Sequence, residues 1–452
     1  MAHRTTSSSL TAALWSIALP AMLTNVATAL FGLADMWTIG QLADAAAQGG
    51  VELGAKAMMA SLNLFNFLRT GTVALTARAT GADDPYARTQ TLVRASTVAL
   101  TIGAVLLCTM PWLVPVELAA LGANNGTQLH YAATIYLSIR FWAAPVWLMN
   151  CVLTGWLIGQ RRVRSVLLVE VLTNLTHIAL DLLLVLVLHH GVAGVAFATF
   201  LSETLKFTLL ALFAIRSPAM TDILSMLHHT LRDKATWSRD AIARLFSLNR
   251  DLFLRTLLLS GAILTFARVG TVQGPTMLAA NGILFQLFML ASLILDGFES
   301  AAQVLCGEAL GRQERLGFTR SLRAAMLWGG ALGLVLSLAY ALGSGRLIAT
   351  FSTDPLVVAQ ALTYAPWLIA VPLAGFASFV LDGAFVGAGW TRAMLGTMGI
   401  AMALYTALLL GLADIGNNGL WLAFVVFLMV RAAGQLTMLP VLLRRTFPLP
   451  SR

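Results

Sequence analysis

The chain has 452 residues, of which 58% are hydrophobic and only 11% are charged, and its mean hydropathy is +0.81. A soluble domain has about 25% charged residues, so this composition excludes a soluble globular enzyme, a disordered chain and a disulfide-rich secreted module. The net charge of +9 is attributed to cytoplasmic loops of a membrane protein, and no nucleic-acid partner is expected. Long apolar runs without alternation argue against an outer-membrane barrel.

Hydropathy predicts an all-α integral membrane protein with twelve spans, separated by breakers such as Gly81 to Pro85 and Gly343 to Gly345. The spans are expected near residues 12–40, 53–79, 91–114, 128–159, 164–188, 191–215, 249–270, 276–310, 319–342, 357–389, 393–413 and 416–441. Three parts follow: an N-terminal lobe over residues 1–215, a cytoplasmic linker over 216–248 and a C-terminal lobe over 249–452.

The basic residues gather in the loops on one side of these spans, for example Arg88, Arg161 and Arg312. The opposite loops hold only Lys56, Arg268 and Arg346. This asymmetry predicts that both termini lie in the cytoplasm. The linker mixes charges with apolar residues at helical spacing, which favours a helix on the membrane surface over a regulatory or nucleic-acid role.

The two halves repeat each other. Gly155 to Gly159 resembles Gly383 to Gly387 at an offset of 228 residues, and Arg164 and Arg392 keep the same offset. Because six spans separate the matches, both halves begin on the same side of the membrane. Parallel six-helix halves are typical of transporters that bind their substrate between two lobes.

The first half contains ionisable groups within its spans, where charge is costly and therefore suggests function. Asp35 lies in the first predicted span, which also holds Pro20, a residue that can allow a helix to bend. The fifth span carries four polar residues at spacings that place them on one helical face. These are Glu170, Asn174, His177 and Asp181. A buried carboxyl group beside an imidazole suits a proton relay, and a structural hydrogen-bond network is the alternative. Thr199 in the sixth span is expected nearby.

The second half offers Asp296, Glu299 and Asp382 as candidate cation ligands. Pairing of these acids with Arg69, Arg140, Arg255 or Arg431 is the competing explanation. Glu203 and Lys206, one helical turn apart, are expected to form a local ion pair.

No nucleotide-binding, metalloprotease or nucleophile-elbow motif occurs in the sequence, so no catalytic residues are assigned. The three cysteines stand alone in apolar stretches and are interpreted as packed thiols. No metal site and no cofactor are expected.

Several short motifs together resemble the MATE (multidrug and toxic compound extrusion) transporters, in the branch of DNA-damage-inducible protein F. The resemblance covers nearly the full length and rests on Ala18 to Pro20, Gly32 to Asp35, Phe67 to Gly71, Leu248 to Asp251, Asp296 to Phe298 and Asp382 to Gly387.

This resemblance implies two six-helix lobes in a V, and export of cationic amphipathic compounds against H⁺ or Na⁺. It also implies a cation site from Asp35, Asp181 and Thr199, with Asn174 upstream and Pro20 in gating. His177 stands where the family has an asparagine, which favours H⁺ because imidazole is a poor ligand for Na⁺. The expected partners are small-molecule substrates and membrane lipids, for a monomer in the bacterial inner membrane.

Two other functions stay open at this point. A lipid-linked oligosaccharide flippase of the same superfamily would need a strongly cationic cavity, for which Arg69, Arg140 and Arg255 are available. An integral membrane enzyme acting on lipid head groups would need a catalytic cluster near one membrane face, and the sequence places its acidic residues within the spans.

Overall fold

The computed structural model is built from long helices and contains no strand in its described part. The structure describes residues 7–41, 44–120, 126–216, 226, 230, 232–233, 238–352 and 354–447. Eleven helices within these ranges are long and apolar enough to cross a membrane. The predicted all-helical membrane fold is therefore confirmed.

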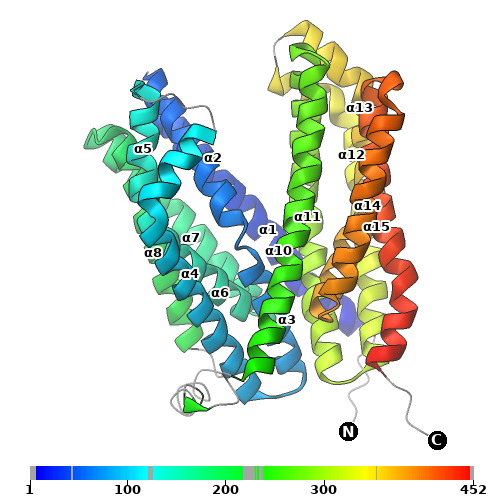
Figure 1. Cartoon of the computed structure of the whole chain (residues 1–452). Helices are drawn as coiled ribbons and strands as arrows, with labels where there is room; N and C mark the ends of the chain where they lie inside the picture. The colour runs from blue at the N-terminus through cyan, green and yellow to red at the C-terminus, as the bar shows by residue number, and fades with distance from the viewer. Residues whose placement is uncertain are drawn as a thin grey trace, which may run out of the picture. The chain divides into compact units, whose positions relative to one another are not determined.

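The chain forms two compact units. The N-terminal unit comprises Leu23–Arg244, and the C-terminal unit combines Met1–Met22 with Leu245–Arg452. Helices α1 to α8 run from blue to green in Figure 1, and α10 to α15 run from green to red. The first set is α1 (Ser7–Gly40), α2 (Ala45–Asn63), α3 (Phe67–Gly81), α4 (Pro85–Ala120), α5 (Gln128–Arg140), α6 (Ala144–Gly159), α7 (Val163–Asp181) and α8 (Gly191–Ile215). The second set is α10 (Arg239–Val272), α11 (Pro275–Gly311), α12 (Arg315–Phe351), α13 (Pro355–Gly387), α14 (Thr391–Gly411) and α15 (Asn417–Thr446).

Helix α1 belongs to both units, a feature absent from the predicted division at residues 215 and 249. Its first turns pack within the C-terminal unit, where the Trp15 ring lies 5.2 Å from that of Phe298 and 5.4 Å from that of Trp328. A side chain at Gly297 would collide with Met22, which shows how closely α1 and α11 approach. Pro20 is buried inside α1 just before the boundary between the units, which falls after Met22.

The second predicted span, 53–79, is wrong in its start and in its continuity. Helix α2 begins at Ala45 because Asp44 caps it, accepting hydrogen bonds from the backbone N–H groups of Ala46 and Ala47 at 3.0 Å each. Its small and polar first turn has too little hydropathy to stand out in the sequence. A turn at residues 64–66 then separates α2 from α3.

The internal repeat is visible in how the helices pack. In the N-terminal unit, α6 lies against α3 because Gly155 faces the backbone carbonyl of Arg69. In the C-terminal unit, α13 lies against α11 because Gly383 faces the carbonyl of Glu299. The two pairs are related by 383 − 155 = 228 and 299 − 69 = 230 residues. The repeated glycines therefore serve the same close helix contact in both halves.

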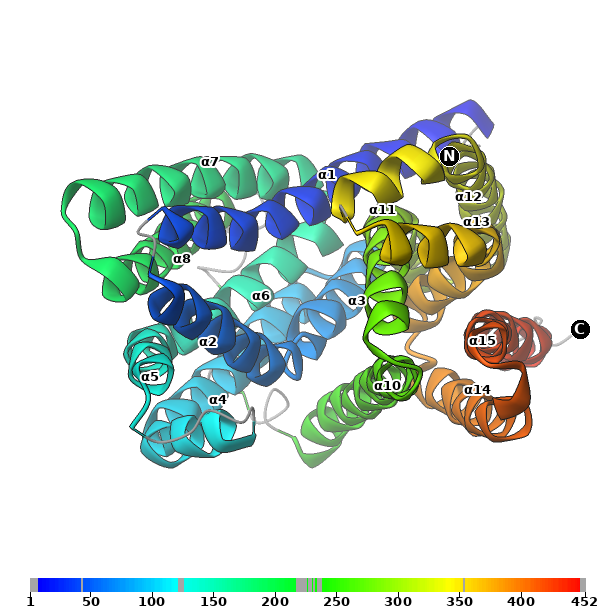
Figure 2. The ribbon, with the colours of Figure 1, turned by 90° about the horizontal axis from the view of Figure 1, so that it is seen from above.

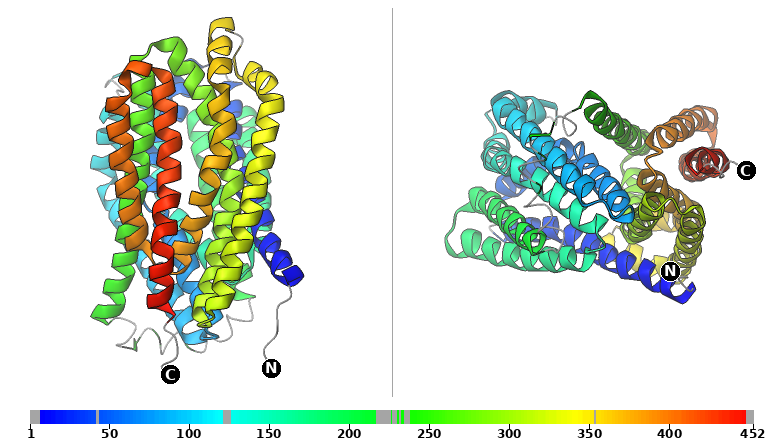
Figure 3. Two further views of the ribbon diagram at one scale, coloured as in Figure 1. Left: turned by 90° about the vertical axis from the view of Figure 1, so that its right-hand side faces the viewer. Right: turned by 90° about the horizontal axis from the view of Figure 1, so that it is seen from below.

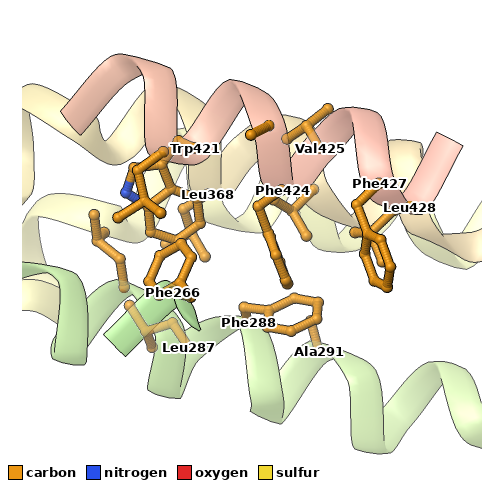
Figure 4. Packing of buried hydrophobic residues seen from close by; sticks show 14 of the residues in the cluster. Phe266, Leu287, Phe288, Ala291, Leu368, Trp421, Phe424, Val425, Phe427 and Leu428 are labelled. Atoms are coloured by element: carbon orange, nitrogen blue, oxygen red, sulfur yellow. The ribbon is translucent and has the colours of Figure 1, made fainter. Parts of the chain in front are cut away.

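The core of the C-terminal unit is aromatic. Trp421 and Phe424 of α15 pack against Phe266 of α10 and Phe288 of α11 (Figure 4). Helices α14 and α15 lie side by side in this unit (Figure 3). Phe288 belongs to this core, and Phe285 packs against it.

About half of the predicted linker, 216–248, lies outside the described residues. Its last part is already helical, because α10 begins at Arg239 and not near residue 249. The Tyr86 hydroxyl at the start of α4 donates a hydrogen bond to Asp233 of the linker.

Candidate functional site

The polar residues of α7 point inward. Glu170, His177 and Asp181 are buried, and Asn174 is half-buried. The opposite face carries exposed apolar side chains such as Leu175 and Ile178. Helices α7 and α8 run beside one another (Figure 2). The 3.6-residue period thus places four polar side chains along one buried line, with lipid-compatible residues on the other side.

At the C-terminal end of α7, three titratable side chains meet. The Nε2 atom of His177 lies 2.6 Å from Oδ1 of Asp35 and 3.2 Å from Oδ2 of Asp181. One potential ligand atom from each of the three residues lies within 4.8 Å of the others. All three residues are buried, His177 and Asp181 fully so. This set is called the acidic–histidine cluster below.

Two features of the backbone position this cluster. Asp35 projects from the second half of α1, so the cluster joins α1 to α7. Asp181 is the last residue of α7, and a π-helical segment (Leu182–Val187) follows it directly. π-Helical turns are rare and frequently mark functional sites.

Ser202 of α8 completes the cluster and was not selected from the sequence. Its Oγ lies 3.0 Å from Nδ1 of His177. The available signal was its position one helical turn after Thr199, on the same face of α8. Serine in a membrane helix commonly bonds to its own backbone, so this spacing alone does not single it out.

Thr199 and Asn174 lie close in sequence to the cluster residues but make other contacts. The Thr199 hydroxyl is fully buried and donates to the carbonyl of Val195 in its own helix, at 3.0 Å. The Asn174 side chain donates to the carbonyl of Ala27 on α1, at 2.8 Å. Asn174 therefore links α7 to α1 by a hydrogen bond beside the cluster.

A second polar network lies two helical turns before His177 on α7, and it shows that the predicted ion pair between Glu203 and Lys206 is wrong. Lys206 does not pair with Glu203 but with Glu170 on the neighbouring helix, with 2.7 Å between Nζ and Oε2. Glu170 also accepts a hydrogen bond from the Thr28 hydroxyl of α1. Glu203 instead accepts a hydrogen bond from the Asn150 amide of α6, at 2.7 Å. Glu203 and Lys206 are close enough along α8 to pair, but each instead contacts a residue of a neighbouring helix, α6 for Glu203 and α7 for Lys206.

In the C-terminal unit, Asp382 is neutralised by arginine. Its Oδ2 atom accepts hydrogen bonds from the guanidinium groups of Arg255 and, at 2.5 Å, of Arg431. Its Oδ1 atom accepts a hydrogen bond from the Gln435 amide at 2.6 Å. The alternative of pairing with arginine, left open by the sequence, is therefore what Asp382 adopts. Glu299 and Asp296 lie within electrostatic range of Arg255. All the carboxylates expected to act in the second lobe thus share one charged cluster with two arginines.

A helical membrane protein that buries titratable groups inside its spans, and whose halves repeat each other, has features typical of transporters. The MatE family model matches residues 20–183 and 253–410, which together exceed half of the chain. The chain belongs to the MATE family of multidrug and toxic compound extrusion transporters, as the sequence motifs indicated.

The chain is 34% identical to DNA damage-inducible protein F of Escherichia coli over 419 residues, which is 93% of this chain and 90% of the relative. It is 27% identical to the probable multidrug resistance protein NorM of Caulobacter vibrioides over 353 residues, 76% of this chain and 72% of that one. A solved structure described as MATE in the bent conformation superimposes with a TM-score of 0.84 at 21% identity, covering 97% of each chain. The predicted twelve-helix fold class is confirmed by these likenesses.

Proposed function

We propose that this protein is a proton-coupled exporter of cationic amphipathic compounds in the bacterial inner membrane, with both termini in the cytoplasm. The observation that carries the proposal is the acidic–histidine cluster, in which Nε2 of His177 lies 2.6 Å from Asp35 and 3.2 Å from Asp181. Three groups able to exchange protons lie together within the spans of one unit, where an ionisable residue is a functional group by default.

The chemistry of the cluster favours H⁺ over Na⁺. A hard cation such as Na⁺ prefers oxygen ligands, and the centre of this cluster is an imidazole nitrogen. Asn174 and Thr199 keep oxygen atoms that could bind a cation, but neither is among the three residues whose ligand atoms meet in the cluster. The cluster is therefore better suited to protons.

Coupling requires no covalent chemistry. A carboxylate that binds a proton loses its attraction for a cationic substrate, so proton entry at Asp35 or Asp181 would release the cargo. Pro20 removes one backbone hydrogen bond from α1, the helix that carries Asp35, and would let this helix bend as the cluster changes protonation.

We place the coupling site in the N-terminal unit. Asp382 is engaged by Arg255, Arg431 and Gln435, so its charge is compensated within the protein. Glu299 and Asp296 stay candidates for contact with cargo. The flippase alternative needs free cationic side chains, and the pairing of Arg255 with Asp382 works against it.

The test uses purified protein in liposomes and a fluorescent cationic dye. Dye movement driven by a pH gradient, indifferent to Na⁺ and lost in Asp35→Asn, is the expected result. Asp83→Asn is the matched control, because Asp83 lies in an exposed turn at φ 51°, a conformation that Asn adopts readily. Transport that requires a Na⁺ gradient and persists in Asp35→Asn would contradict the proposal. Absence of dye movement under either gradient would favour the flippase.

A further inference from the structure

The hydrogen bonds around His177 determine which nitrogen of its ring carries a proton. The Ser202 hydroxyl donates its single proton to the carbonyl of Ala198, one turn earlier in α8. The Ser202 oxygen is then an acceptor toward Nδ1 of His177, which lies 3.0 Å away. This arrangement suits a His177 ring with its proton on Nδ1, which leaves Nε2 facing the two carboxyl groups.

The contact between His177 and Asp35 requires a second proton. With Nδ1 protonated, a neutral ring presents only a lone pair at Nε2, and a lone pair repels an ionised carboxylate. At 2.6 Å, Nε2 and Oδ1 are too close to be two unprotonated atoms, so a proton lies between them. One exchangeable proton is therefore shared between His177 and Asp35.

Asp181 provides a place for another proton. It is fully buried, so its charge is not compensated by solvent. Its neighbours are the His177 ring at 3.2 Å and the Asp35 carboxyl group. A second ionised carboxylate beside Asp35 in a buried site is costly, and protonation of Asp181 removes this cost.

The surroundings hold further charges that act on the cluster. Tyr136 of α5 is in electrostatic range of Asp35 and Asp181, and Arg140 lies one turn further along α5. Glu170 and Lys206 neutralise each other two turns from His177. Glu203 of α8 accepts a hydrogen bond from Asn150. The Nε2 atom of His177 itself contacts Asp35 and Asp181.

We infer that the acidic–histidine cluster carries two protons in each transport cycle, one shared between His177 and Asp35 and one on Asp181, and that Ser202 is the positioning residue that makes the shared proton exchangeable. This inference rests on the proposed proton coupling and adds its stoichiometry. Without the Ser202 acceptor, a neutral His177 could carry its proton on Nε2 and bond to ionised Asp35. The hydrogen bond between His177 and Asp35 would then form without the uptake of a proton.

The test measures the balance point of transport, not its rate. Liposomes contain a monovalent cationic dye, the membrane potential is clamped at zero with K⁺ and valinomycin, and a pH gradient of about one unit is imposed. The dye gradient at balance should be about 100-fold for two protons and about 10-fold for one, because each coupled proton contributes one factor of ten. This ratio does not depend on how much of the protein is active.

The wild-type chain and Ser202→Thr, which keeps the hydroxyl, should balance at about 100-fold. Ser202→Ala and Asp181→Asn should each balance at about 10-fold, although Ser202→Ala leaves all three titratable groups in place. A merely structural role of Ser202 would lower the rate and leave the ratio at about 100-fold, which would overturn its positioning role. A wild-type ratio of about 10-fold would overturn the stoichiometry and leave proton coupling intact. A dye gradient that stays the same whether or not a pH gradient is imposed would instead refute the proposed function.

Discussion

Lys206 of α8 reaches Glu170 of α7 across the helix interface, and the two charges lie 2.7 Å apart with only 19% and 5% of their side chains exposed. This largely buried ion pair stabilises the packing of α7 against α8 in the N-terminal unit. Glu170 extends the link to α1 through the Thr28 hydroxyl. The network therefore holds the three helices that also form the acidic–histidine cluster.

Replacing Lys206 by Met should destabilise the protein strongly, because it leaves the buried Glu170 carboxylate without its partner. Loss of one member of a buried pair costs about 3–5 kcal/mol. The double variant Glu170→Gln with Lys206→Met should recover much of this loss. Thermal unfolding of the detergent-solubilised protein measures both effects. The pair formed by Glu52 and Lys56 is a matched control, because both side chains are at least half exposed and Lys56→Met should hardly change the unfolding temperature. Equal effects of Lys206→Met and Lys56→Met would contradict this account.

The glycine contacts of the internal repeat lead to a second prediction. A methyl group at Gly383 would collide with the backbone carbonyl of Glu299, which no side-chain rotation can relieve. Gly383→Ala should therefore lower the unfolding temperature, by the roughly 1–3 kcal/mol typical of overpacking. Gly396 of α14 has open space where a methyl group would lie, so Gly396→Ala should stabilise the helix by about 0.5–1 kcal/mol. Opposite signs for these two substitutions are expected, and a stabilised Gly383→Ala would show that α11 and α13 can separate without cost.

Periodicity accounts for the part of the site that could be predicted from the sequence. The spacing of Glu170, Asn174, His177 and Asp181 determines that they share a helix face, and the apolar face opposite determines that this face is buried. Which side chains meet across helices has no such local signal. Asp382 is 127 residues from Arg255 and 49 from Arg431, and only packing decides that these groups pair. The division of α1 between two units cannot be predicted from the sequence for the same reason, because the contact between Trp15 and Phe298 is a tertiary one.

The arginine pairing of Asp382 yields a third prediction. Asp382→Asn would leave Arg255 and Arg431 close together in a buried site without the carboxylate that bonds to both of them. We expect a loss of about 3–5 kcal/mol, seen as a lower unfolding temperature and a lower yield of monodisperse protein. Asp354→Asn is the control: Asp354 caps α13 through its side chain, and Asn caps a helix equally well. If Asp382→Asn unfolds at the wild-type temperature and abolishes transport, Asp382 belongs to the coupling machinery.

The last prediction concerns His177 as the determinant of the coupling ion. His177→Asn replaces a nitrogen base by an amide whose oxygen can bind a hard cation, beside the carboxylates of Asp35 and Asp181. In liposomes, dye transport by this variant should respond less to a pH gradient and acquire a dependence on a Na⁺ gradient. His130→Asn is the matched control, because His130 lies in the first turn of α5, outside the cluster, and its replacement should leave the ion dependence unchanged. Transport by His177→Asn that keeps the full proton dependence of the wild type would assign ion selection to the two carboxyl groups alone, since they are the titratable groups of the cluster that this substitution leaves in place.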